Sequence, residues 1–89
     1  MAELIEVKPL KEQKIYLKYS NGLEGIYSLS KVMQKEEYKF LNDEKIFKKV
    51  TVDKATNDVT WGNGILLCKN AIYKQLELMQ LAEKLKLNI

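Results

Sequence analysis

The first third of the chain alternates apolar and polar side chains, which is the period of β-strands. Segment 4–10, LIEVKPL, carries Pro9 near its end and predicts an edge strand, because proline cannot donate a hydrogen bond to a neighbouring strand. The next strand has an apolar side formed by Ile15, Leu17 and Tyr19. Asn21-Gly22 then predicts a two-residue hairpin turn with positive φ at both residues, followed by a return strand over 23–27.

The middle of the chain changes between helical and strand patterns over short distances. A short helix is predicted over 30–36, sealed at its far end by the apolar side chains of Tyr38, Phe40 and Leu41. A further helical turn follows, begun by Asn42 or Asp43, with Ile46 and Phe47 facing inward. Two more strands are indicated by alternation at 50–52 and 59–61.

The last part of the chain predicts a long helix over about 71–86, with Asn70 as its cap. Its apolar residues form two stripes. One stripe contains Ile72, Leu76 and Met79, and a second, roughly 120–140° around the axis, contains Leu78, Leu81 and Leu85. A helix that covers a small sheet needs only one stripe. The second stripe is therefore a candidate interface with another copy or a cognate partner, and the alternative is a helix wedged between two parts of its own domain.

These elements predict a single α+β domain over residues 1–89. Short turns between successive strands favour antiparallel pairing, so the expected architecture is one antiparallel sheet of about five short strands, in the order β-β-β-α-β-β-α, with the long C-terminal helix. A domain of this length hides only about 60–65% of the surface of its unfolded chain. Little material is then left to cover both stripes of the last helix.

The stretch VTWGNGI, residues 59–65, looks most like a compact binding loop. It contains the single tryptophan and two of the four glycines. A phosphate-binding loop needs a wider glycine spacing that opens directly into a helix, and no Lys-Ser or Lys-Thr follows these glycines. The stretch therefore predicts a tight turn at Asn63-Gly64, with Trp61 buried against Val50, Val52 and Ile72.

The charged residues alter this picture little. Fifteen basic and twelve acidic residues give a net charge of +3, and every basic residue is lysine. Sequence-specific nucleic-acid readers rely on the bidentate guanidinium of arginine, whereas lysine supports weaker, salt-sensitive phosphate contact. The outer face of the hairpin carries an aromatic residue between lysines, in the group Lys14, Tyr16 and Lys18. This group is a candidate contact for single-stranded nucleic acid, against the simpler interpretation of a solvated strand face.

The absence of histidine excludes whole classes of site. Ser-His and Cys-His nucleophile pairs are impossible, and the commonest zinc ligand is missing. The single cysteine, Cys68, stands beside two leucines and is expected to be a small buried apolar residue. Asp53 and Asp58 offer too few oxygen ligands for calcium. We therefore predict no catalytic residue, no structural metal and no nucleotide cofactor.

The compartment follows from the same residues. One cysteine allows no internal disulfide, which fits a reducing cytosol. Apolar runs stay short of the roughly 18 residues of a membrane span, and the first residues do not have the pattern of an export signal. The expected location is the cytoplasm, without membrane contact.

Six short motifs occur in a recognisable order. They are Val7-Lys8-Pro9-Leu10, Tyr19-Ser20-Asn21-Gly22, Tyr27-Ser28-Leu29, Phe47-Lys48-Lys49-Val50-Thr51-Val52, Trp61-Gly62-Asn63-Gly64 and Ile72-Tyr73. In this order and spacing the chain resembles the domain-of-unknown-function 2442 family of small prokaryotic domains, over roughly residues 5–75. The pattern departs from the family at Ser28, Gly62, Leu66 and Cys68, where the family has aspartate, proline and acidic residues. A carboxylate patch shared by the family would be missing here.

The resemblance implies a fold more strongly than a task. Members of the family are similar to parts of toxin–antitoxin-like gene pairs, and some are joined to helix-turn-helix domains. This implies an adaptor or regulatory partner rather than an enzyme. The hypothesis is a non-enzymatic protein–protein interaction or regulatory module, either self-associating or antitoxin-like, and the alternative is a weak, non-specific binder of single-stranded nucleic acid.

Overall fold

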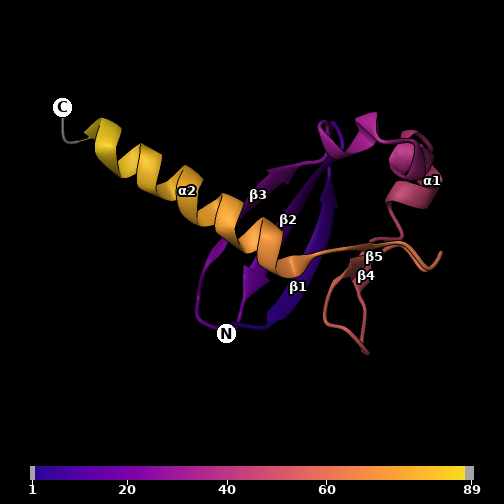
Figure 1. Cartoon of the computed structure of the whole chain (residues 1–89), viewed down its shortest axis with the longest axis horizontal. Helices are drawn as coiled ribbons and strands as arrows, with labels where there is room; N and C mark the ends of the chain where they lie inside the picture. The colour runs from indigo at the N-terminus through magenta and orange to yellow at the C-terminus, as the bar shows by residue number, and fades with distance from the viewer. Residues whose placement is uncertain (1, 88–89) are drawn as a thin grey trace.

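The computed structural model describes residues 2–87, with side chains as far as Leu85. The elements in chain order are β1 (Leu4–Leu10), β2 (Lys14–Tyr19), β3 (Glu24–Ser28), the 3-10 helices η1 (Val32–Gln34) and η2 (Glu36–Asn42), α1 (Glu44–Phe47), β4 (Thr51–Val52), β5 (Val59–Thr60), β6 (Leu66–Leu67) and α2 (Lys69–Leu87). The α+β class and the long C-terminal helix are confirmed (Figure 1).

The first three strands form one antiparallel sheet in the order β1-β2-β3. The predicted alternation on β2 is confirmed, because Ile15 and Leu17 are fully buried and Tyr19 is 1% exposed. Pro9 lies in the edge strand β1, opposite Ile15. The sheet therefore has one face that belongs to the core and one face that lies in solvent.

The turn between β2 and β3 differs from the predicted two-residue form. Only Gly22 has positive φ, at 92°, and Tyr19 N donates to Leu23 O at 2.8 Å. The loop thus has three residues and ends in a left-handed glycine, which is a common alternative for hairpins. Asn21 uses its side chain instead, since its Oδ1 accepts from Leu23 N at 3.1 Å and its Nδ2 donates to the Tyr73 hydroxyl at 2.8 Å.

The predicted α-helix over 30–36 is wrong. Two 3-10 helices, η1 and η2, occupy this region, separated by extended backbone at Lys35. An isolated α-helix of so few residues is poorly stabilised, whereas a 3-10 helix brings residues three apart onto one side. Tyr38 and Leu41 have that spacing on η2, and both are buried. The cap at Asp43 is confirmed, because its carboxylate accepts from Lys45 N at 3.0 Å at the start of α1.

The remaining strands form a second antiparallel sheet, in the order β4-β5-β6, instead of extending the first. The side chain of Asn57 explains the separation. Its Nδ2 donates to Leu4 O and its Oδ1 accepts from Leu4 N, both at 2.9 Å, so at Leu4 the backbone groups that a further strand would use are already bonded. The sixth strand, β6, was not predicted, because Leu66-Leu67-Cys68 shows no alternation.

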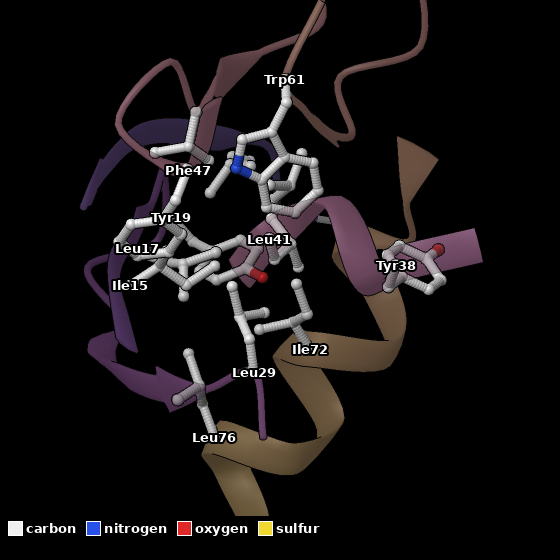
Figure 2. Packing of buried hydrophobic residues seen from close by; sticks show 13 residues of the cluster. Ile15, Leu17, Tyr19, Leu29, Tyr38, Leu41, Phe47, Trp61, Ile72 and Leu76 are labelled. Carbon is white, nitrogen blue, oxygen red and sulfur yellow. The ribbon is translucent and has the colours of Figure 1, made fainter. Parts of the chain in front are cut away.

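Trp61 lies in the core shared by the two sheets and α2, as predicted (Figure 2). Its side chain is 3% exposed and meets the ring of Phe40 edge to face, with centroids 5.5 Å apart. Val50 and Ile72 belong to the same buried cluster, and Val52 packs against it. Within the described residues, the indole Nε1 is buried without a hydrogen-bond partner. Trp61 therefore stabilises the fold by packing rather than by polar contact.

Candidate interaction surface on the C-terminal helix

The start of α2 is held by a residue far away in sequence. The helix begins at Lys69, so the predicted cap at Asn70 is wrong. The carboxylate of Asp58 accepts from Lys69 N at 3.0 Å, and its Oδ1 also lies 3.8 Å from Lys69 Nζ. A carboxylate at this position stabilises the partial positive charge of a helix N-terminus. Asp58 thereby fixes where α2 leaves the second sheet.

Two tyrosines fix the direction of α2 across the first sheet. The hydroxyl of Tyr19, on β2, donates to Lys69 O at 2.8 Å. Burial, followed by the nearby Cys68 and Tyr73, raises the pKa of Tyr19 to about 12. The ring of Tyr73, in the second turn of α2, meets Tyr19 edge to face with centroids 5.0 Å apart. The helix therefore leaves the sheet along a direction set by side chains of β2.

The sheet-facing side of α2 is shorter than predicted. Ile72 and Leu76 are each 1% exposed, and we call these two residues the inner stripe. Leu76 packs so closely on β3 that a Cβ at Gly25 would lie 2.9 Å from Leu76 Cδ2. Met79, predicted to pack on the sheet as well, is 50% exposed. The sheet still runs beside this part of α2, but Met79 only lines an open groove with Gly25 and Ile26 of β3, and Gln80 Nε2 donates to Glu24 O at 2.8 Å.

The opposite side of α2 carries the predicted interface residues, which we call the outer stripe. Leu78, Leu81 and Leu85 are 59%, 54% and 60% exposed. These leucines lie in the C-terminal half of α2, which projects beyond the strands in Figure 1. The molecule accordingly measures 43 Å along its longest axis, against 26 and 19 Å along the other two. A groove of about 550 Å³ runs beside the outer stripe, and Leu23 of the hairpin closes its other side.

The residues around the outer stripe are polar and exposed. Glu77 and Lys84 line the groove together with the leucines, and Lys74 stands one turn before Leu78. Among the described residues, the ion pairs involve none of these three side chains. The surface is thus an apolar seam with the charged side chains of Glu77 and Lys84 along one edge. Such a seam is typical of helix pairing rather than of a pocket for a small molecule.

The predicted nucleic-acid group lies on the outer face of the first sheet, as the alternation requires. Its basic residues are accompanied by acids. Lys14 Nζ is 3.6 Å from a carboxylate oxygen of Glu12, and Lys18 stands opposite Glu24 across the hairpin. The hydroxyl of Tyr16 donates to Glu24 Oε2 at 2.8 Å, and this hydrogen bond is the main reason that the pKa of Tyr16 is raised. The face is therefore charge-balanced rather than basic.

The WGNG stretch forms a turn, as predicted, and not a phosphate-binding loop. Gly62 and Gly64 have positive φ values of 80° and 84°. Asn63 Oδ1 accepts from Ile65 N at 3.2 Å, and Thr60 Oγ1 donates to Ile65 O at 3.0 Å. The side chains of the turn thus bond to its own backbone, which closes the loop upon itself.

The prediction that Cys68 is buried is wrong, because its thiol is exposed. Cys68 directly precedes α2, at the point where the chain turns from β6 into the helix, so it lies at the edge of the core.

The acidic residues considered for a cation are also engaged locally. Hydrogen bonds from Thr56, and one from Ala55 N at 3.1 Å, hold the pKa of Asp53 below its usual value. In the described part of the chain, no three cysteine, aspartate or glutamate side chains gather in a way that could hold a metal ion.

Comparison with known proteins places most of this structure in one family. The family described as Protein of unknown function (DUF2442) matches residues 4–77, which confirms the resemblance seen in the sequence. The match ends just before Leu78, so the outer stripe lies beyond it. No curated protein and no solved structure matched the chain. Within residues 2–87, α2 and the other helices are too short or too polar to cross a membrane.

Proposed function

The chain belongs to the DUF2442 family, whose description gives no activity, and from the geometry of α2 we propose that it is a non-enzymatic protein–protein interaction module. The binding surface is the outer stripe. The observation that supports this most is the exposure of its three leucines, each above 50%, on a helix that is already anchored by its inner stripe. Full burial of a leucine side chain contributes about 1.5–3 kcal/mol, so a partner that covers three of them gains several kcal/mol.

Among the described residues, the outer stripe is not part of the hydrophobic core. Ile72 and Leu76 already attach α2 to the sheet, whereas each leucine of the outer stripe remains more than half exposed. A contiguous apolar strip that is exposed on a projecting helix is typical of a surface that binds another protein. An antitoxin-like or other regulatory role would use such a surface to hold a cognate protein.

One further observation supports binding rather than catalysis, and a second supports a cytoplasmic location. The groove beside α2 is lined by leucines, Gln80, and Lys and Glu side chains without a nucleophile–base pair. The exposed thiol of Cys68 persists most readily where thiols are kept reduced. The alternative of single-stranded nucleic-acid binding has weaker support, because Glu12 and Glu24 offset the positive charge around Tyr16.

The experiment that tests this proposal is the double substitution Leu81→Lys and Leu85→Lys. Both residues are exposed in the isolated chain, so circular dichroism should show an unchanged fold. Association, with another copy by light scattering or with a cognate protein by co-purification, should be lost, because a lysine charge would be buried without a partner. Met79→Lys is the matched control: Met79 is 50% exposed on the same helix but off the stripe, and its substitution should leave association intact.

Two results would contradict the proposal. An unfolded double variant would show that the leucines are covered within the domain. A folded variant that associates as the wild type does would show that the outer stripe is not the surface used.

A further inference from the structure

We infer that the outer stripe binds the outer stripe of a second copy, with the two α2 helices antiparallel and with Glu77 of each copy paired to Lys84 of the other. This inference rests on the proposed function and specifies its partner. It follows from the spacing of the apolar residues on α2, from the charges beside them and from the exposure of the whole face.

The spacing along α2 is that of a helix-pairing seam. Lys74, Leu78, Leu81 and Leu85 follow one another at intervals of four, three and four residues. This repeat keeps one side of a helix against a partner helix. Ala71, Lys74 and Gln75 are exposed over the domain itself, so the seam stays open along the anchored half of α2. A second helix can therefore lie along α2 without meeting the sheet.

The charges beside the seam select the antiparallel orientation. Glu77 and Lys84 immediately precede Leu78 and Leu85 and so lie on one flank, whereas Gln75 and Ala82 lie on the other flank. In an antiparallel pair, equal flanks face each other, and Glu77 meets Lys84 twice because of the two-fold symmetry. In a parallel pair, unequal flanks face each other, and Glu77 meets the uncharged Ala82.

The same charges fix the register. The pairing places Leu78 of each copy beside Leu81 of the other at the centre, with Lys74 beside Leu85 at both ends. Lysine tolerates this end position, since its alkyl chain can cover the leucine while its ammonium stays in water. A shift of one heptad in either direction places Glu77 opposite Glu77, or Lys84 opposite Lys84, and like charges oppose each other.

The contact surface is small, so the proposed dimer is expected to be weak. From Lys74 to Leu85 the seam is about 17 Å long, at a rise of about 1.5 Å per residue. Interfaces of this kind bury less than the roughly 1,200 Å² of a standard stable complex. The dimer should therefore dissociate in the micromolar range, and concentration becomes the variable that reveals it.

Exchange of the paired charges tests the inference with the full-length chain. Glu77→Lys leaves only lysine pairs across the dimer, and Lys84→Glu leaves only glutamate pairs. Each variant should self-associate about tenfold more weakly than the wild type at low salt, by sedimentation equilibrium. An equimolar mixture of the two variants should recover the wild-type affinity as a heterodimer, and so should the double variant that carries both changes. Glu83→Lys, with the same charge change away from the seam, is the control and should have no effect.

The possible failures can be told apart. If the wild type dimerises but the mixture associates no better than the separate variants, the antiparallel pairing is wrong, while the outer stripe still stands if Leu81→Lys dissociates the dimer. If the wild type stays monomeric up to about 100 micromolar, a second copy is not the partner. The proposed interaction with a cognate protein is then judged by the leucine variants alone.

Discussion

The docking of α2 on the first sheet includes one especially close contact, between Leu76 and Gly25. A methyl group at Gly25 would lie 2.9 Å from Leu76 Cδ2, so a side chain at position 25 requires the end of the Leu76 side chain to shift. Leu76 is 1% exposed, and its truncation to alanine leaves a cavity. The free energy of unfolding should fall by about 3 kcal/mol, within the range for buried leucines.

Gly25→Ala should have different effects on the stability of the wild type and of the Leu76→Ala variant. In the wild type, the end of the leucine side chain can shift, so the overlap costs about 1 kcal/mol, and the reduced freedom of the unfolded chain offsets about 0.5–1 kcal/mol of it. In the Leu76→Ala background the overlap is gone. The new methyl then fills part of the cavity, worth about 0.8 kcal/mol, and the substitution should stabilise the protein by about 1.5 kcal/mol. The expected coupling energy is therefore about 1.5–2 kcal/mol.

The assay is urea unfolding of the four proteins in this cycle, followed by the fluorescence of Trp61, the single tryptophan. Gly22→Ala serves as the control, because Gly22 has a φ of 92° and open space around it, so its substitution should destabilise both backgrounds equally. If Gly25→Ala changes both backgrounds by the same amount, within about 0.5 kcal/mol, the contact does not exist and the described docking of α2 is wrong.

Three further predictions concern the core and its turns. Trp61→Ala should lower the free energy of unfolding by about 3–5 kcal/mol, whereas Trp61→Phe should lower it by only about 1 kcal/mol, since it removes an N–H that is buried without a partner; thermal unfolding by circular dichroism would show equal losses if packing were unimportant. Tyr19 keeps its proton in the folded state up to a pKa of about 12 but loses it near 10 when unfolded, so stability should fall as pH rises from 10 to 12. Tyr19→Phe should flatten that fall in alkaline urea titrations, and an unchanged pH dependence would reject the assignment. Gln13→Gly should raise the free energy of unfolding by about 0.5–1 kcal/mol, because Gln13 has a φ of 53°. A loss of stability in urea unfolding would contradict this.

The hydrophobic periodicity of the sequence predicted the strands of the first sheet and the long helix α2. Alternation at Ile15, Leu17 and Tyr19 is enough to define β2, because one buried face demands it. The two stripes of α2 were readable for the same reason, and the exposure of Leu78 and Leu81 agrees with the prediction that they do not face the sheet.

Several of the failures involve residues whose partners lie elsewhere in the chain. Asn57 ends strand pairing at Leu4, across a separation of 53 residues, and no pattern around either residue announces that contact. Asp58 was considered as a cation ligand, but it caps α2 eleven residues later. Met79 has the right helical angle to pack on the sheet, but it lines an open groove beside Gly25 and Ile26 of β3 and stays 50% exposed. Such contacts follow from the assembled fold and not from the period of a segment.

Sedimentation velocity on the wild type and on the double variant Leu81→Lys with Leu85→Lys measures whether the outer stripe of α2 joins two chains. At equal concentrations near 100 micromolar, the wild type should sediment as a dimer of the 10.4 kDa chain and the folded double variant as a monomer. Equal sedimentation of the two folded proteins, whether both as monomers or both as dimers, would contradict a dimer formed through the outer stripe.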